Sequence, residues 1–453
     1  MKNFFNLFFL ATIMLTVSCT NKDENEFKDA NAWIRDSMEE NYLWNERVPG
    51  SVDGSIPPGA FFGSMLDPND FMSFIVQDPS LENGSQGEDF SYGAGVSPAF
   101  GAFSNSQIIF IVAEFIYPNS SADTAGLERG DIILEIDGTT LTTNNYLNLF
   151  YSSNETIEYT LGEYNSEQNT ISVTNEIVTV AQTNVELNPV VHKSVIEQDN
   201  KKIGYLFYPE FKNGTNDRYI DSVDAALQEF KSEGITDVIV DLRYNSGGDF
   251  SSAENLGNAL TSQSAIQNEE IFVRFKYNDV IEQRIIDEEG AESENLIRRF
   301  SSDPENLGIG RVYFLTTTQT SATSELLING LIPHTNVKIV GGATNGQLFG
   351  STIINGEDAV PAISYSIVPV NLRLQNSEES AEPTYRLVPD IEVTENLFDT
   401  KPIGDVNDPL LSAALQDITG GTQTSAKSTL ISYQLLPDLR AEQKGRLLFS
   451  KNN

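Results

Sequence analysis

Apolar residues along the chain follow helical spacing in some stretches and strand-like spacing in others. Near the N-terminus, Ala30, Ile34 and Met38 lie at offsets 0, 4 and 8, which places them on one face of a helix. Several prolines between residues 49 and 68 divide the following stretch into short pieces. We therefore expect a small helical domain over residues 27–86.

The next region, residues 87–190, has the pattern of a β-rich domain. A glycine-rich stretch, SYGAGVSPAFGAF, leads into the apolar run IIFIVAEFIY, which is typical of a strand. The chain then turns sharply at Gly130-Asp131 and continues into a strand-rich segment with many Asn and Thr residues. This pattern predicts a β domain followed by a bridge.

Residues 191–400 alternate between strand and helix patterns. Val223, Leu227 and Phe230 belong to a helical stripe that ends at Gly234, and the next segment, TDVIVDLRYNSGGDF, resembles a buried strand with a glycine turn after it. Further strands are predicted at RVYFLTT and NVKIVGG. Repeated strand–helix–strand order predicts an α/β layer with partly parallel strands. In such sheets, sites lie where strand ends meet loops.

Length and charge restrict the possible partners. A chain of 453 residues predicts two or three domains. The 65 acidic and 28 basic residues give a net charge of −37, which argues against nucleic-acid binding and predicts a soluble, self-repelling surface. With two histidines and one cysteine, the sequence offers no metal cluster, and no phosphate-binding loop is present. We expect no cofactor.

The N-terminus predicts export. Lys2 precedes an apolar run over residues 4–17, which is too short for a comfortable membrane span but suits a signal peptide over residues 1–18. Cys19 is the only cysteine, so no intramolecular disulfide can form. A lone cysteine after a small residue resembles a bacterial lipobox. This resemblance implies that Cys19 carries a lipid, with residues 19–26 as a tether. The alternative is an ordinary signal peptide with an incidental cysteine.

The tether TNKDENE resembles the acidic export tags of surface lipoproteins in Bacteroidetes-type bacteria. We therefore expect a lipid-anchored protein of the cell envelope, at the outer membrane.

One segment of the second region has a characteristic series of small, apolar and turn residues. They are Pro118, Ser120, Ala122, Ala125-Gly126-Leu127, Gly130-Asp131, Ile133, Ile136 and Asp137-Gly138. With this series the segment resembles a PDZ domain. PDZ domains bind extended peptides and free C-termini by strand addition, with the backbone amides of one loop holding the carboxylate. The resemblance implies that this carboxylate-binding loop is Gly93, Ala94, Gly95 and Val96, for which the alternative is a plain glycine turn.

Several motifs follow one another along the third region, namely GYLFYPEF, VIVDLRYNSGG, SELLINGL, VGGATNG and RLVPDIEV. Through these motifs and the domains before them, nearly the whole chain resembles the C-terminal processing, or tail-specific, serine peptidases, and most of all their lipoprotein members in Bacteroidetes-type bacteria. The resemblance implies an α+β multidomain protein with a small helical N-terminal part, a β-barrel-like PDZ domain and an α/β tail-specific peptidase core. We place the core at residues 191–400 and a C-terminal tail at residues 401–453.

The same resemblance implies a serine nucleophile and a lysine base, which lie at fixed places in the family's motifs. The serine is the first of an S-A-S-E run, where this chain has Ala322, Thr323 and Ser324 before Glu325. The lysine follows a glycine 25 residues later, where this chain has Gln347. A methyl group cannot attack a carbonyl, and an amide has no basic lone pair at usable pH. Both halves of the dyad are therefore absent.

Two serines near this position remain as candidates for catalysis. We expect Ser321 to act as the helix N-cap and the Ser324 hydroxyl to point to backbone or solvent, with the nucleophile as the alternative role for each. Glycines 247 and 248 are the candidate oxyanion-hole donors, because backbone N–H groups stabilise a developing oxyanion. The alternative for Gly247 and Gly248 is a tight strand-to-helix connection that needs glycine regardless.

The sequence therefore favours an envelope lipoprotein that binds peptides or unfolded protein C-termini and has weak or lost proteolytic activity. One alternative is an active serine endopeptidase that uses Ser324 or Ser321 with an unrecognised base. A second alternative is a non-catalytic PDZ scaffold that holds the C-terminus of an envelope partner.

Overall fold

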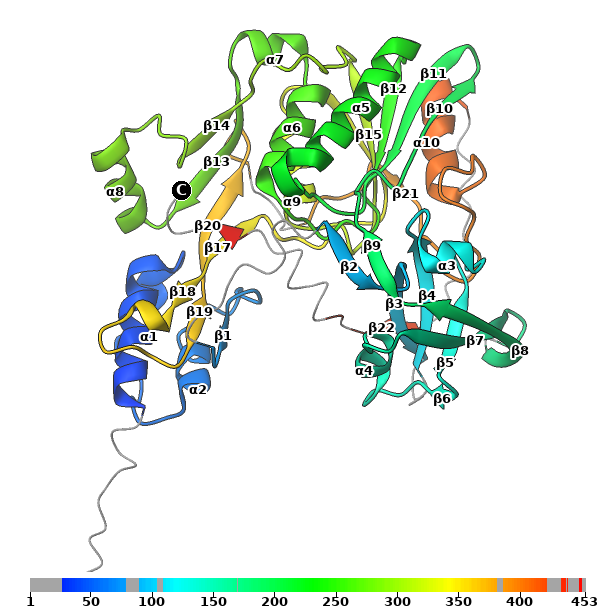
Figure 1. Ribbon diagram of the computed structural model, residues 1–453. Coiled ribbons are helices and arrows are strands. Elements are labelled where there is room, and N and C mark those ends of the chain that lie inside the picture. The colour runs from blue at the N-terminus through cyan, green and yellow to red at the C-terminus, as the bar shows by residue number, and fades with distance from the viewer. Residues whose placement is uncertain are drawn as a thin grey trace, which may run out of the picture.

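The computed structural model shows the predicted α+β multidomain architecture, with a helical N-terminal part, a PDZ domain and an α/β core (Figure 1). The predicted signal peptide, Cys19 and the tether lie outside the described residues. No helix in the described part of the chain is long and apolar enough to cross a membrane. The structure describes residues 27–78, 89–103, 109–168, 170–380, 386–421, 433–436, 438 and 448–449.

The helical N-terminal part is built on α1 (Lys28–Asn41), as the apolar spacing predicts. Ala30, Ile34 and Met38 are all buried, and Ile34 and Met38 pack with the phenylalanines of α2 (Pro58–Gly63). A small sheet with the order β1-β19-β18 completes this part. Its strands are β1 (Phe74–Val76), β18 (Ile354–Asn355) and β19 (Ser366–Val368), so two of them come from the far end of the chain.

The PDZ domain contains a seven-stranded sheet in which β22-β3-β4-β5-β7-β8 are neighbours in that order and β6 pairs with β5. The strands β2 and β9 form a separate antiparallel pair. The β-rich prediction for this region is confirmed, but β22 comes from the C-terminal region. The elements are β2 (Phe90–Gly93), β3 (Val96–Phe103), β4 (Ile109–Ile116), α3 (Ser121–Thr124), β5 (Ile132–Ile136), β6 (Thr139–Thr140), α4 (Tyr146–Phe150), β7 (Thr156–Asn165), β8 (Thr170–Ala181), β9 (Thr183–Glu186) and β22 (Tyr433–Leu435).

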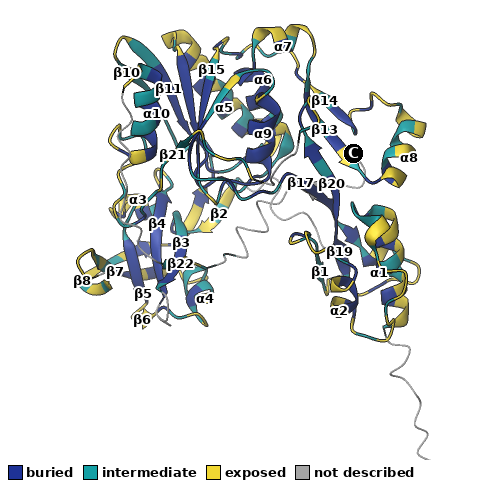
Figure 2. Ribbon diagram, turned by 180° about the vertical axis from the view of Figure 1, so that it is seen from behind, coloured by how far each residue is buried: buried dark blue, intermediate teal, exposed yellow. Residues whose placement is uncertain are grey.

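The core is a six-stranded sheet with the order β10-β11-β12-β15-β16-β21. Only β10 is antiparallel to its neighbour, so the partly parallel α/β layer is confirmed. The residues of β12 are buried along its whole length, as expected for a strand covered on both faces. The neighbouring strands β11 and β15 are likewise largely dark blue, the colour of buried residues, in Figure 2. The strands are β10 (His192–Gln198), β11 (Lys201–Phe207), β12 (Asp237–Asp241), β15 (Arg311–Thr316), β16 (Asn336–Gly341) and β21 (Ile391–Glu392).

Helices cover both faces of this sheet. One face packs on α5 (Arg218–Glu233), α6 (Phe250–Leu260) and α9 (Thr323–Leu331). The predicted stripe Val223, Leu227 and Phe230 is the buried side of α5, which ends at Gly234 in the left-handed conformation. The opposite face packs on α10 (Pro409–Thr419), whose leucines lie among side chains of the sheet. The packed core therefore continues into the segment that the sequence assigns to a C-terminal tail.

A second sheet of five strands joins the core to the N-terminal part, with the order β14-β13-β20-β17-β23. It consists of β13 (Ile271–Tyr277), β14 (Ile297–Arg299), β17 (Phe349–Thr352), β20 (Val370–Gln375) and β23 (Leu448–Phe449). The remaining helical elements are α7 (Gln263–Gln267), α8 (Asp279–Glu289) and the short 3-10 turns Asn45–Arg47, Thr215–Asp217 and Gly356–Asp358.

A buried ion-pair network fixes the PDZ domain to the core. Arg129 of the PDZ domain contacts Glu395 and Asp408, and Arg243 of the core contacts the same two carboxylates. Arg243 also pairs with Asp241 at the end of β12, at 2.7 Å. Since both guanidinium groups share their carboxylate partners, the position of the PDZ domain is coupled to the carboxyl end of the central sheet.

Candidate active site

Three loops meet at the carboxyl end of the central sheet. They follow the neighbouring strands β12, β15 and β16 and span residues 242–249, 317–322 and 342–348. Because parallel neighbours end at the same edge, residues that are distant in sequence come together there. These loops hold Ser321, Ala322, Gly247, Gly248 and Gln347, and Ser324 lies in the first turn of α9, directly after the second loop.

Ala322 occupies a strained position at the start of α9. It is the N-cap residue, with φ +49° and ψ −110°, and its side chain is fully buried. A non-glycine residue in such a conformation costs about 1–3 kcal/mol. Sharp, strained strand-to-helix turns are one way in which hydrolases present a nucleophile. The turn therefore has the geometry of a nucleophile site, although its side chain is a methyl group.

Glu325 joins this turn to the loop that follows β16. Its Oε2 accepts hydrogen bonds from the backbone N–H groups of Ala322 at 3.1 Å and Gln347 at 2.6 Å. Its Oε1 accepts from the Gly346 N–H at 2.7 Å and from the Thr344 hydroxyl. One carboxylate thus holds both positions at which the resemblance places the dyad.

The side chain of Gln347 is half-buried and lines a pocket of about 870 Å³ between the PDZ domain and the core. Among the described residues that line this pocket there is no lysine, histidine or arginine. The described wall therefore offers no nitrogen base to a hydroxyl nucleophile. The described residues also contain no group of three or more His, Cys, Asp or Glu side chains that could hold a metal ion.

The two candidate serines donate their hydroxyl protons to backbone carbonyls. Ser321 Oγ donates to the Ser246 carbonyl at 2.9 Å, and Ser324 Oγ donates to the Asn245 carbonyl at 3.1 Å. The predicted N-cap role of Ser321 is wrong: Ala322 is the N-cap residue, and the Ser321 hydroxyl bonds to a different loop. The prediction that Ser324 points to backbone is confirmed. Neither proton is directed at a base.

The glycine turn after β12 is engaged in structural contacts. The Gly247 N–H donates to the Asn245 side chain at 2.8 Å, so it is not free to bind an oxyanion in this state. A Cβ at Gly248, where φ is +126°, would lie 2.0 Å from the Phe211 carbonyl oxygen. No acceptor for the Gly248 N–H is found among the described residues. The tight connection is thus present, and of the two candidate donors Gly247 lines the pocket while the N–H of Gly248 is the one without an acceptor among the described residues.

The predicted carboxylate-binding loop lies on the PDZ side of the same pocket. Gly95 has φ +93°, and a Cβ there would lie 2.3 Å from the Ser120 Cβ, so only glycine fits. The Ala94 and Gly95 carbonyls accept hydrogen bonds from Ala122 and Tyr117, both at 2.9 Å. Gly93, Ala94, Gly95 and Val96 all line the pocket, together with Ser321, Gly247 and Gln347 of the core.

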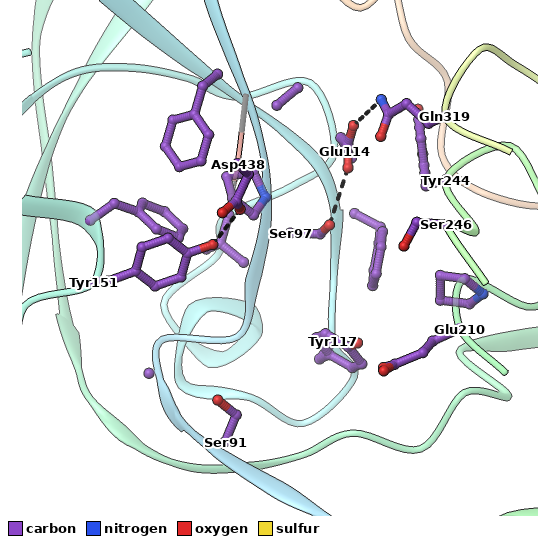
Figure 3. Close-up of a pocket in the computed structure, with 18 of the residues that line it drawn as sticks. Ser91, Ser97, Glu114, Tyr117, Tyr151, Glu210, Tyr244, Ser246, Gln319 and Asp438 are labelled. Atoms are coloured by element: carbon purple, nitrogen blue, oxygen red, sulfur yellow. Dashed lines mark hydrogen bonds between the residues drawn. The ribbon is translucent and has the colours of Figure 1, made fainter. Parts of the chain in front are cut away.

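Glu114 is a site residue that the sequence analysis missed. It is buried in β4, and burial raises the pKa of its carboxyl to about 8. It accepts hydrogen bonds from Gln319 Nε2 at 2.6 Å and from Ser97 Oγ at 3.2 Å (Figure 3). The PDZ strand β3 is therefore linked through Glu114 to the turn that carries Ala322. In the sequence, the only indication of this role is that Glu114 is a single acidic residue within the apolar run IIFIVAEFIY.

The model of peptidase family S41 matches residues 202–393, from β11 to the strand β21. The model of the peptidase S41 N-terminal domain matches residues 29–92, and a PDZ domain model matches residues 114–157. The three matches follow one another in the order of the domains described above. The chain belongs to peptidase family S41.

Two known proteins are similar to this chain over different lengths. A crystal structure described as that of an S41 protease from Bacteroides fragilis is 26% identical, with a TM-score of 0.67, over 86% of this chain and 98% of that chain. The carboxyl-terminal-processing peptidase 2 of Arabidopsis thaliana chloroplasts is 24% identical over 218 residues. That match covers 47% of this chain and 38% of the plant protein.

The buried carboxyl of Glu325 makes the stability of this S41 member depend on pH. Burial raises its pKa from the ordinary 4.5 to about 7, against the lowering effect of its hydrogen bonds. Between these values the folded chain holds a proton that the unfolded chain releases, so stability falls as pH rises from 4.5 to 7. We expect Glu325→Gln to flatten this slope by up to about 1.4 kcal/mol per pH unit.

Urea unfolding at intervals between pH 4.5 and 8 measures the slope for the native chain, Glu325→Gln and the exposed-site control Glu357→Gln. The control should keep the native slope. Identical slopes in all three chains would contradict the raised pKa of Glu325.

Proposed function

We propose that this S41 member binds extended peptides or protein C-termini in the pocket between its PDZ domain and its core, and cleaves them weakly or not at all. The observation that carries the proposal is the pair Ala322 and Gln347 at the dyad positions, both tied to the carboxylate of Glu325. The fold of the peptidase is present, and the groups that would perform its chemistry are missing.

The roles of the nucleophile and the base determine how much peptidase activity is lost without them. Removing the nucleophile or the base of a serine protease lowers kcat by about 10⁶, because the two groups act as one unit. A methyl at position 322 has no lone pair, and the amide of Gln347 takes up no proton at neutral pH. The Ser321 and Ser324 hydroxyls do not replace them, since each is hydrogen-bonded to a carbonyl of the loop after β12.

The pocket supports peptide binding in an extended form. It runs from the loop Gly93–Val96 along β3 to Gly247 and Gln347, so one extended chain could contact both domains. Strand addition supplies affinity through backbone hydrogen bonds, which do not depend on a catalytic residue. Retained binding is therefore compatible with lost cleavage.

Two alternative functions would require different behaviour of the same residues. An active endopeptidase that uses Ser324 or Ser321 would have to break a hydroxyl–carbonyl bond and recruit a base. A non-catalytic scaffold would hold the C-terminus of one envelope partner in the PDZ groove and would not need the core side of the pocket.

Restoring peptidase activity should require both missing groups together. Ala322→Ser alone supplies a hydroxyl without a base, and Gln347→Lys alone supplies an amine that faces a methyl group. The double change should raise the cleavage of an unstructured protein by orders of magnitude over either single change. The assay compares the native chain, both single variants and the double variant.

The control is Ser321→Ala/Ser324→Ala, which removes the two remaining hydroxyls. Strong cleavage by the native chain that disappears in this control would refute the proposal and support the endopeptidase alternative. A folded double variant without activity would show that the loss extends beyond the dyad.

The loop Gly93–Val96 should hold a free carboxylate through backbone N–H groups. We expect a peptide with a free C-terminus to bind about tenfold more tightly than the same peptide with a C-terminal amide, because the amide carries no charge. Fluorescence anisotropy with both peptides measures the ratio. Equal affinities would remove carboxylate capture from the proposal.

We also propose that Cys19 is lipidated and anchors the protein in the cell envelope, at the outer membrane. The sequence before it supports the proposal through its apolar run and small preceding residue. Cys19→Ser should move the protein from the detergent phase to the aqueous phase in detergent partitioning. If the native chain and Cys19→Ser partition alike, the lipid anchor is ruled out.

A further inference from the structure

A segment of the chain's own C-terminal region lies along the PDZ strand β3. The strand β22 pairs antiparallel with β3, with Tyr433 opposite Phe103 and Leu435 opposite Gly101. The Leu436 N–H then donates to the Phe100 carbonyl at 2.8 Å. The edge of β3 at which strand addition would take place is therefore occupied along residues 100–103 by residues of the same chain.

The direction of this segment is that of a PDZ ligand. The strand β3 begins at Val96, next to the loop Gly93–Val96, and β22 runs antiparallel to it. The segment therefore advances toward the loop as its residue numbers rise. An added peptide whose C-terminus is held by that loop would run the same way.

The side chains of the segment divide between groove and solvent. Leu436 packs against the apolar cluster that includes Phe100 and Tyr146, whereas Leu435 is 39% exposed. The Asp438 carboxylate accepts a hydrogen bond from the Tyr151 hydroxyl at 2.5 Å, at the end of α4 (Figure 3). The groove thus holds an apolar side chain and, two residues later, a carboxylate.

We propose that residues 433–436 and 438 act as a built-in ligand of the PDZ groove, which external peptides must displace. The groove then takes extended segments with the same pattern, namely an apolar residue followed two positions later by a carboxylate. This inference rests on the proposed peptide-binding function. It adds the ligand class and the competitor that regulates access.

Tethering gives the built-in ligand an advantage over a free peptide. At an effective concentration of about 1 mM, a segment with an intrinsic Kd of about 0.1 mM would occupy the groove in about nine chains of ten. An external peptide would then bind about tenfold more weakly than to an empty groove.

The test uses the full chain with a single substitution in the segment. Leu436→Asp places a charge against the apolar cluster and should release the segment, while Leu435→Asp changes the exposed neighbour and serves as the matched control. The probe is a fluorescent peptide with the sequence of residues 431–440. We expect Leu436→Asp to bind it about tenfold more tightly than the native chain and Leu435→Asp do.

A second readout follows the segment without any ligand. The backbone amides of Phe100 and Ala102, the residues of β3 that face β22, should exchange hydrogen slowly in the native chain and in Leu435→Asp, and faster in Leu436→Asp. Adding the peptide should restore the slow exchange in Leu436→Asp.

Three results would overturn the inference. If all three chains bind the probe equally and show equal exchange, the segment does not compete for the groove, although peptide binding itself stands. If a probe with Asp at the position of Leu436 binds as well as the native sequence, the ligand pattern is wrong. If no chain binds this probe or any free C-terminal peptide, both the inference and the proposed function fail.

Discussion

The geometry of the site depends on the buried carboxylate of Glu325. Three backbone N–H groups and one hydroxyl converge on it, and they offset part of the cost of burying the group. These donors come from the turn at Ala322 and from the loop after β16, so one side chain fixes two loops. Ala322 keeps its strained backbone because this surrounding structure determines it. Under the proposed function, the peptidase geometry persists without the peptidase side chains.

The sequence predicted those parts of the fold that depend on local pattern. The buried face of α1 follows from the spacing of Ala30, Ile34 and Met38, and the end of α5 follows from Gly234. Motif spacing likewise placed Ala322 and Gln347 in one site. The contact of Ser321 was missed because its partner, the Ser246 carbonyl, belongs to another loop.

Long-range contacts could not be predicted in the same way. The strand β22 pairs with β3, which comes much earlier in the sequence. The short sequence of β22 does not indicate which strand it pairs with. In the sequence, Glu114 is one acidic residue in a predicted strand. Only the fold shows that Gln319, which is distant in the sequence, donates a hydrogen bond to it. Through these contacts the PDZ groove, the turn at Ala322 and the C-terminal segment share one pocket. Under the proposed function, a peptide bound in the groove would therefore lie in the same pocket as the turn that carries Ala322.

The central claim is that this S41 fold has no reactive serine. It is tested most directly by incubating the native chain with a fluorophosphonate, which forms a covalent adduct with activated serine hydroxyls, and measuring the mass of the intact protein. The Ser321 and Ser324 hydroxyls both donate to carbonyls, so the account predicts an unchanged mass. A stoichiometric adduct that peptide mapping places on Ser321 or Ser324 would contradict it.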